Sequence, residues 1–541
     1  QSTIMDPNNT NVEDCETPTG VIGLGAVYGA ASAALVVLMW LVAFHRKFCV
    51  AIWKTNKVTP YGVYTTITEA LRTHYWYILC QALGVDGGNS AEQRKAWLAR
   101  VTTLFLQNLN VLPQSAGSNS GSIAIEAVSD KELQKHQAII SHSCRAIFYY
   151  IIKSLLDKSK ARTGKSHIKI CICSVQFGSF YRLMRGMEKS LDCTIEFLEV
   201  DMIAKDWTID WSSINENDVK SCDLIMAQHL FGVPFEQTKF WEWAQKFDIP
   251  IVEDNVQSGS IFGKYKGNPK SDAILYSGGL DKTPSCFGGG FGYFRHTKYG
   301  DELYASCRKM HDERPLDTTK ARLIAVLNQT IHTMIAQNTL WFNNLVSLLF
   351  YVFFTDRGES IQFYKASLKV RKNKSITPFQ HAESGFLRHP CVAHLKSMAH
   401  GFLKKEQYHS IAREEVRRRQ VLLDNIPQEY HGKLFPWWTP AVLKQHEDNL
   451  GVSEFSWVNA YQTNDRLDLC KFLNEEYVVC MINTTWEYHT DSKFPVGKDI
   501  NESLVYLPNI NHLDNDASIV DLARVLTKYC VEGGGKATKK L

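Results

Sequence analysis

Two carboxylates and one lysine stand directly after two apolar segments that we expect to be neighbouring strands. The apolar segment 249–252 (IPIV) runs into Glu253 and Asp254. The segment 273–277 (AILYS) leads into a glycine-rich turn that carries Lys282. The carboxyl ends of parallel strands border the crevice in which α/β sheets bind ligands. The spacing therefore predicts that a carboxylate and a lysine converge in a ligand site at one edge of a sheet.

A converging lysine and carboxylate are the groups that pyridoxal phosphate requires. A lysine with a lowered pKa forms an imine with the aldehyde of the cofactor, and a carboxylate keeps the pyridinium nitrogen protonated, so that the ring accepts electrons. We therefore expect Lys282 to hold the cofactor and Asp254 to pair with its ring, while the glycines at 288–290 let the backbone pass close by. The spacing alone also allows Asp254 to be a helix cap and Lys282 a solvated turn lysine.

The middle of the chain alternates short apolar runs with amphipathic stretches. This alternation is typical of an α/β fold with a mostly parallel sheet. We expect strands at 167–175, 193–201, 222–230 and 249–255, and helices at 144–158, 180–191 and 236–247.

The flanking regions have a different character. Residues 45–130 are expected to form a helical N-terminal region and linker, with a Ser/Gly-rich loop at 114–122. Residues 131–400 are expected to form the cofactor-binding large domain, with an apolar insertion near 315–380. A long charged helix near 405–425 opens a smaller α+β domain at 401–541.

Across roughly 130–530, except about 315–380, the chain resembles the DegT/DnrJ/EryC1/StrS family of pyridoxal-phosphate-dependent sugar aminotransferases, of the aspartate aminotransferase fold type I. Several motifs in the family's order carry the resemblance. They are QHLFG at 228–232 (family VHLYG), VEDNVQS at 252–258 (IEDAAQA), YSGGLDK at 276–282 (FSF-x-x-x-K), the glycines at 288–290 (GEGG) and SLVYLPNINHL at 503–513 (LSLPLYP).

The resemblance implies a role for each matching residue. Lys282 would be the Schiff-base lysine, Asp254 the partner of the pyridinium nitrogen, and Gln257 a neighbour of the cofactor's 3-oxygen. Phosphate would be bound by Ser277 and by the N-terminus of a helix that opens with His142 and Ser143. Phe177 would stack on the ring and His229 would lie near the cofactor, although simple core positions are the alternative for both. The family also implies a homodimer with sites at the subunit interface.

The sequence departs from the family at two of these places. Ser-His-Ser at 141–143 replaces Ser-Gly-Thr, so that His142 crowds the phosphate approach. Phe386-Leu387-Arg388 replaces Asn-Tyr-Arg, which removes the Asn that reaches the phosphate of the partner subunit. Two interpretations follow. The chain is an aminotransferase that moves an amino group from an amino acid to a sugar-like or membrane-borne carbonyl acceptor, or it is a weakly active or inactive scaffold in a membrane complex.

Composition excludes several other classes. With 45% hydrophobic and 21% charged residues among 541, the chain is globular, and a net charge of +4 gives no argument for nucleic acid. The 14 cysteines include no CxxC pair, so we expect reduced thiols and no metal site.

An uncharged apolar segment, Val21–Phe44, is expected to cross a membrane. A helix over this segment would be about 36 Å long, against an apolar core of about 30 Å. Acidic residues precede it and basic residues follow it, so residues 1–20 would lie outside and the body in the cytosol, at an endomembrane or the plasma membrane. A second apolar run, Leu340–Phe354, is too short to span and fits a core helix, a dimer interface or a helix on the membrane face. Because the sequence starts at Gln1 and not at Met, we also expect that a segment is missing before it, for which a signal peptide and a mitochondrial presequence are the alternatives.

Overall fold

The computed structural model describes the central part of the chain and parts of its C-terminal region. The described residues are 91–113, 128–203, 209–229, 237–256, 261–279, 282–317, 386–434, 460–462, 469, 472, 481–482, 486–487, 504–506 and 515–532. The predicted membrane segment Val21–Phe44 and the apolar run Leu340–Phe354 lie outside these residues. Within them, no helix is long and apolar enough to cross a membrane.

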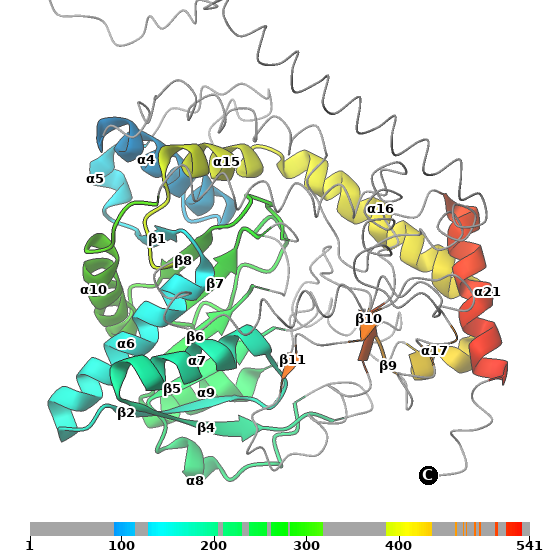
Figure 1. Ribbon diagram of the computed structural model, residues 1–541, viewed down its shortest axis with the longest axis horizontal. Helices are drawn as coiled ribbons and strands as arrows, with labels where there is room; N and C mark the ends of the chain where they lie inside the picture. The colour runs from blue at the N-terminus through cyan, green and yellow to red at the C-terminus, as the bar shows by residue number, and fades with distance from the viewer. Residues whose placement is uncertain are drawn as a thin grey trace, which may run out of the picture.

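A seven-stranded mixed sheet forms the centre of the molecule (Figure 1). Its order is β1-β8-β7-β6-β5-β2-β4. Strands β2, β4, β5, β6 and β7 are parallel, and β8 runs antiparallel to both β7 and β1. The strands are β1 (Gln137–Ser141), β2 (His167–Cys173), β4 (Thr194–Val200), β5 (Leu224–Gln228), β6 (Ile251–Asp254), β7 (Ala273–Ser277) and β8 (Gly290–Phe294).

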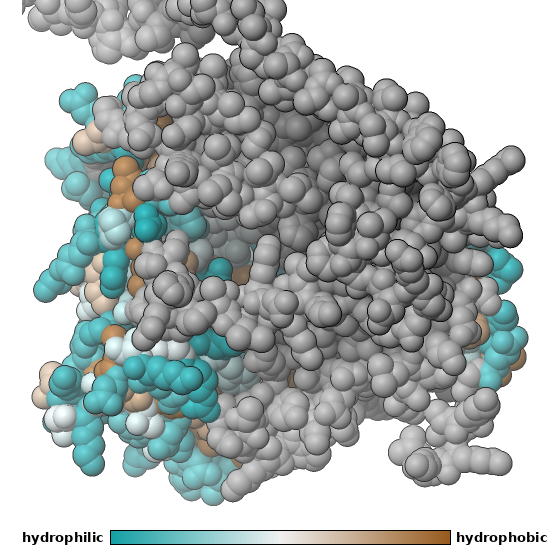
Figure 2. All heavy atoms as spheres, in the orientation of Figure 1, coloured by the Kyte–Doolittle hydropathy of each residue, from teal (hydrophilic) through white to brown (hydrophobic). Residues whose placement is uncertain are grey.

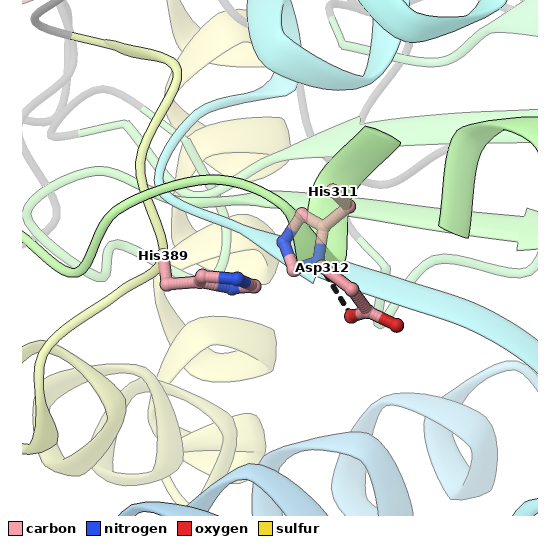
Figure 3. Close-up of side chains that lie close together, drawn as sticks. All are labelled: His311, Asp312 and His389. Carbon is pink, nitrogen blue, oxygen red and sulfur yellow. Dashed lines mark ion pairs between the residues drawn. The ribbon is translucent and has the colours of Figure 1, made fainter. Parts of the chain in front are cut away.

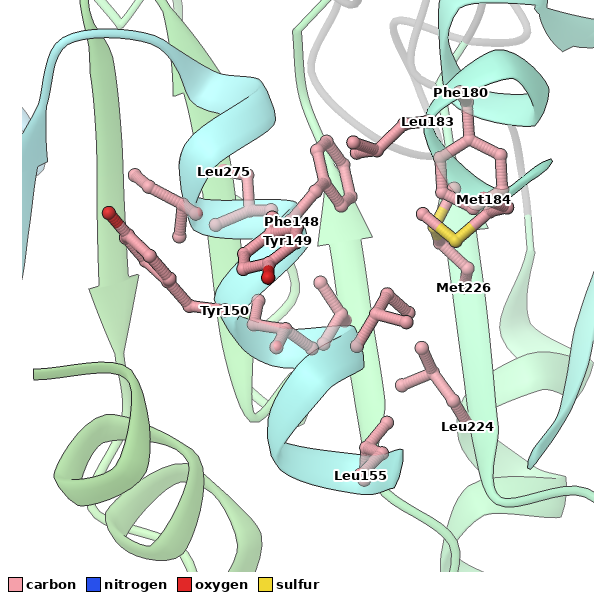
Figure 4. Packing of buried hydrophobic residues seen from close by; sticks show 14 of the residues in the cluster. Phe148, Tyr149, Tyr150, Leu155, Phe180, Leu183, Met184, Leu224, Met226 and Leu275 are labelled. Carbon is pink, nitrogen blue, oxygen red and sulfur yellow. The ribbon is translucent and has the colours of Figure 1, made fainter. Parts of the chain in front are cut away.

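One face of the sheet is covered by α6 (Cys144–Thr163), α7 (Gly178–Leu191) and α10 (Lys298–Asp312). Apolar side chains of α6 and α7 interdigitate with every second residue of the strands, such as Met226 and Leu275 (Figure 4). Helix α6 ends where Gly164 adopts a left-handed φ of 77° and its N–H bonds to the carbonyl of Lys160. The alternate residues of each strand point to the opposite face of the sheet.

The opposite face is covered by α4 (Ala91–Asn108), α15 (Val392–Phe402) and α9 (Thr238–Phe247). Phe105 of α4 and Phe402 of α15 meet Phe291 of β8, with ring centroids 5.6 and 5.2 Å from that of Phe291. Helix α4, which precedes the sheet in the sequence, and helix α15, which follows it, therefore pack together in one hydrophobic core on this face.

The C-terminal part contains α16 (Lys405–Asp424), α17 (Gln428–Leu434), α21 (Asp516–Glu532) and a small antiparallel sheet, β10-β12-β9, of Met481–Ile482, Leu504–Tyr506 and Ala460–Gln462. Arg417 of α16 forms two hydrogen bonds with Asp516 of α21, at 2.7 and 2.8 Å. Strand β11 (Trp486–Glu487) pairs with β3 (Gln176–Phe177) beside α7. Two short helices, α5 (Asp130–Leu133) and α8 (Glu216–Val219), complete the described elements.

The expected fold class is confirmed for the large domain, because each predicted strand and helix of the alternating region is present. The sheet is mixed, since β8 reverses direction. The domain boundaries remain predictions. Figure 2 shows that the described surface on the viewed face is mainly hydrophilic.

Gly290 allows the start of α6 to lie directly against β8. A Cβ atom at Gly290 would stand 2.3 Å from the backbone nitrogen of Cys144 and 2.4 Å from the carbonyl carbon of Ser143. Ser143 also forms a bridge with Gly289. The glycine cluster was expected to admit a ligand, and this stays a prediction, but Gly290 admits the N-terminus of α6, and a Cβ at Gly289 would meet Met398 of α15.

We predict that Gly290→Ala destabilises the fold by roughly 3 kcal/mol, because the clashing atoms are backbone and cannot rotate away. Gly292→Ala is the matched control on the same strand, since its Cβ would meet only side-chain atoms, the nearest of Ile147 at 3.2 Å. Its expected cost is about 1 kcal/mol. Urea unfolding of both variants measures the difference, and equal midpoints would contradict the argument.

Candidate functional site

The carboxyl ends of β6 and β7 present two predicted site residues on one face of the sheet. Side chains alternate along a strand, so Asp254 lies on the same face as Val252, and Ser277 on the same face as Leu275. Val252 and Leu275 pack in the core beneath α6. Asp254 and Ser277 therefore both face the side on which α6 begins. The Ser277 oxygen also accepts a 3.4 Å hydrogen bond from the amide of Gly279.

Asp254 is a buried carboxyl group within electrostatic reach of Lys282. Burial raises its pKa from 3.8 to about 6, while the amide of Val256 and then the charge of Lys282 act in the opposite direction. The Val256 amide donates a 2.9 Å hydrogen bond to Asp254 Oδ1. This contact is a local turn bond to one of the two carboxyl oxygens.

Cys144, the first residue of α6, lies within electrostatic reach of both Asp254 and Lys282. Burial raises the pKa of its thiol, the negative charge of Asp254 raises it further, and the charges of Arg145 and Lys282 lower it. The helix start, the carboxyl group and the lysine thus influence one another although they are far apart in sequence. Asp254 and Lys282 therefore lie close enough for their charges to interact, and their roles toward a cofactor stay predictions.

The loop that carries Lys282 is fixed at both ends. Gly278 bonds through its amide to the carbonyl of Gly289, and its own carbonyl accepts the amides of Cys286 and Gly288 at 3.0 and 2.9 Å. On the other side, the Tyr408 hydroxyl accepts a 3.0 Å hydrogen bond from the Ser285 amide. The loop is thereby held between β8 and α16, and Lys282 itself is half-buried.

The N-terminus of α6 lacks a side-chain cap. Ser143 is the N-cap residue, in extended conformation, but its hydroxyl caps no amide. The Ser141 and Ser143 hydroxyl oxygens are both buried and have no hydrogen-bond partner within the described residues. A helix start with unused donors is suited to bind an anion.

His142 turns toward a buried acidic group. Its Nε2 lies 3.0 Å from Oδ2 of Asp317, and its ring stands edge-on to His394 at 5.3 Å. Its carbonyl accepts the Gly289 amide at 3.0 Å. The imidazole was expected to crowd the phosphate approach; it instead contacts the segments around Asp317 and α15. No sequence pattern predicts the contact with Asp317, because the two residues are distant in the chain.

Glu253 and His229 belong to the opposite face of the sheet. His229 Nε2 lies 2.8 Å from Glu253 Oε1, and both side chains are fully buried. Tyr265, the Asn268 amide and the Ser271 hydroxyl also donate to Glu253. Burial acts to raise the pKa of Glu253, yet these partners, His229 first among them, leave it below its ordinary value. This contact pattern is that of a satisfied core histidine, and a cofactor role for His229 stays a prediction.

Two further predicted residues are less well placed. Gln257 lies outside the described residues. Phe177 is part of β3, paired with Trp486, but its side chain lies outside the described part of the chain. Their predicted roles beside the cofactor ring are untested.

The sheet and its helices define an α/β fold, with Asp254 and Ser277 at the carboxyl ends of β6 and β7. Among solved structures, the chain is similar to DesI, whose structure was determined in the presence of its TDP-sugar product. The TM-score is 0.50 at 12% identity, over 90% of this chain and 95% of DesI. The similarity shows the fold, and the resemblance to sugar aminotransferases of fold type I is confirmed at that level.

Two other solved structures are similar at a lower level. GDP-4-keto-6-deoxymannose-3-dehydratase (ColD), a mutant with bound GDP-perosamine, gives a TM-score of 0.49 at 14% identity, over 87% of this chain and 100% of that chain. The aminotransferase TlmJ from Streptoalloteichus hindustanus gives 0.47 at 12% identity, over 79% and 91%. No family model matches the sequence, and no curated protein matches it.

We predict that Asp254→Asn stabilises the cofactor-free protein at about pH 8 by about 3 kcal/mol. The folded pKa of about 6 exceeds the ordinary 3.8, so the folded chain bears an unfavourable charge above that range. As the pH falls from about 6 to about 4, the wild type takes up a proton on folding and the advantage of the variant disappears. Urea unfolding at several pH values measures this, and a pH-independent difference would contradict it.

Proposed function

We propose that this chain binds pyridoxal phosphate on Lys282 and acts as an aminotransferase. The supporting observation is the meeting of Lys282, the buried Asp254 and the uncapped start of α6 at one end of the sheet. The sequence motifs and the fold similarity to DesI agree with this assignment.

The residues present fit the three parts of the cofactor. The unpartnered Ser143 hydroxyl and the first amides of α6 offer donors to a phosphate, with Ser277 across from them. Asp254 offers a carboxylate to a ring nitrogen. A protonated ring nitrogen would in turn place a positive charge beside this buried carboxylate and stabilise it. Lys282 offers the amine that reacts with an aldehyde.

Each residue then has a physical task. The cofactor supplies an electron sink for bonds broken at the carbon that bears the amino group. Asp254 would hold a proton on the ring nitrogen, because a buried carboxylate is stabilised by a positive charge beside it. Lys282 Nζ would accept and return the proton of the substrate carbon.

The proposed substrates are an amino acid donor and a carbonyl acceptor that is sugar-like or carried by the membrane. The sugar class is suggested by the motifs and by the TDP-sugar product present in the DesI structure. We further propose a homodimer, by analogy with the family that the motifs resemble. The Val21–Phe44 segment would anchor the protein in a membrane with its body in the cytosol.

Lys282→Ala is expected to abolish the visible absorption of the lysine-bound cofactor, since no other amine takes its place in the loop. Borohydride reduction of the wild type should fix the cofactor on the peptide that contains Lys282, as mass spectrometry will show. Lys270→Ala is the matched control, because this exposed lysine precedes the opposite end of β7. A wild type that takes up no cofactor sinks the proposal. Bound cofactor whose absorption no amino donor changes would favour a scaffold instead.

The anchoring proposal has its own test. The full chain should stay with membranes during alkaline carbonate extraction, and deletion of residues 21–44 should release it, because an apolar span is not removed by loss of ionic contacts. Deletion of residues 2–19 serves as control. Glycosylation found at Asn483 or Asn501 would show that the body lies on the other side of the membrane.

A further inference from the structure

A compact group of two histidines and one aspartate lies where α10 ends and the segment before α15 passes. His311 and Asp312 are the last two residues of α10, and His389 precedes α15 (Figure 3). The chain joins them by pairing residues 315–317 with His389. The His389 amide donates to the Pro315 carbonyl, and the Asp317 amide donates to the His389 carbonyl, each at 2.9 Å.

The two imidazoles are buried, and three of their four ring nitrogens have no hydrogen-bond partner within the described chain. His311 is 2% exposed and His389 is 7% exposed. Both ring nitrogens of His311, and Nδ1 of His389, have no hydrogen-bond partner within the described chain. An unsatisfied buried polar atom costs about 1–3 kcal/mol. Two such rings side by side, with centroids 4.2 Å apart, indicate a missing ligand.

An imidazole binds a cation through the lone pair of a ring nitrogen. His389 also has a hydrogen bond with the backbone of Asp312, a type of contact that orients metal-bound histidines.

The spacing of the three side chains suits coordination better than hydrogen bonding. Their ligand atoms all lie within 4.8 Å of one another. Asp312 Oδ1 is 3.7 Å from His311 Nδ1, which is too long for a hydrogen bond. Ligand atoms about 2.0–2.1 Å from a tetrahedral ion lie roughly 3.4 Å apart, so small side-chain rotations would close the site. Arg308 fixes the other oxygen of Asp312 at 2.9 Å.

Nearby charges decide which ion would fit. Asp312 brings one negative charge, while Arg308 pairs with it and Arg94 lies within electrostatic reach. Two guanidinium groups oppose a hard cation that depends on several carboxylates, such as Mg²⁺ or Ca²⁺. Two neutral imidazoles and one carboxylate suit Zn²⁺ or a related transition metal.

We propose that His311, Asp312 and His389 form a Zn²⁺ site, with a fourth position open to water on the exposed side of Asp312. The ion would tie the end of α10 to the segment that precedes α15. That segment pairs with residues 315–317, and Asp317 contacts His142 at the start of α6, so the ion would also stiffen the support of the proposed phosphate-binding helix. Cofactor binding on Lys282 is not needed for the ion to bind.

The test uses the purified full chain, freed of metal by a chelator. One equivalent of Zn²⁺ per chain should remain after dialysis, as measured by elemental analysis, and should raise the midpoint of thermal unfolding, while Mg²⁺ does neither. X-ray absorption by the zinc-loaded wild type should show two imidazole ligands among nitrogen and oxygen donors. A spectrum dominated by sulfur, or no retained zinc, would overturn the proposal without any variant.

Variants locate the ion. His311→Ala and His389→Gln should each lower zinc affinity at least tenfold and remove the thermal shift. His296→Ala is the matched control, because His296 stands 3.2 Å from Asp301 in a similar but exposed pair. Retention of zinc by the His311→Ala/His389→Gln double variant would overturn the assignment, and so would its loss in His296→Ala alone. Circular dichroism before zinc addition identifies any variant that fails to fold.

Discussion

The contact between the start of α6 and the antiparallel strand β8 determines the geometry of the whole site. Ser143 and Cys144 rest on Gly290, where any side chain would collide with backbone. Because of this contact, the unused amides of α6 open at the same edge of the sheet as Asp254 and Ser277. The lysine loop is tied to β8 through Gly278 and Gly289 as well. The close packing of the α6 start on β8 thus brings the residues proposed to bind the phosphate, the ring and the aldehyde of the cofactor to one edge of the sheet.

Because side chains alternate along β6, the adjacent residues Glu253 and Asp254 lie on opposite faces of the sheet and have different surroundings. Glu253 points to the face of α9 and is fully paired with His229 and its neighbours, so its charge is stabilised. Asp254 points to the face of α6, has one local hydrogen bond, and is left with a raised pKa. An underpaired buried carboxyl group is destabilising by itself and becomes favourable once a cation meets it. This contrast is the physical basis for assigning the ligand to the Asp254 side.

The proposed zinc site and the proposed cofactor site share one structural support. The pairing of residues 315–317 with His389 brings the two histidines together and also places Asp317 beside His142. A zinc ion that stabilised this pairing would therefore also stabilise the start of α6 through Asp317 and His142, without contacting the proposed cofactor. The histidine at position 142, where the resembling family has glycine, contacts Asp317, and a glycine could not make this contact.

The amino-acid sequence was sufficient to predict the alternating strands and helices, and it placed Lys282 and Asp254 after neighbouring strands, since apolar periodicity and the carboxyl-end rule depend only on local order. It did not determine which face of the sheet each acid would take relative to α6, nor that Gly290 serves a helix start. It also gave no sign of the His311, Asp312 and His389 group, and its cysteine pattern had argued against any metal site. Only tertiary structure decided these points, because each depends on contacts between segments that are distant in the chain and that no local periodicity encodes.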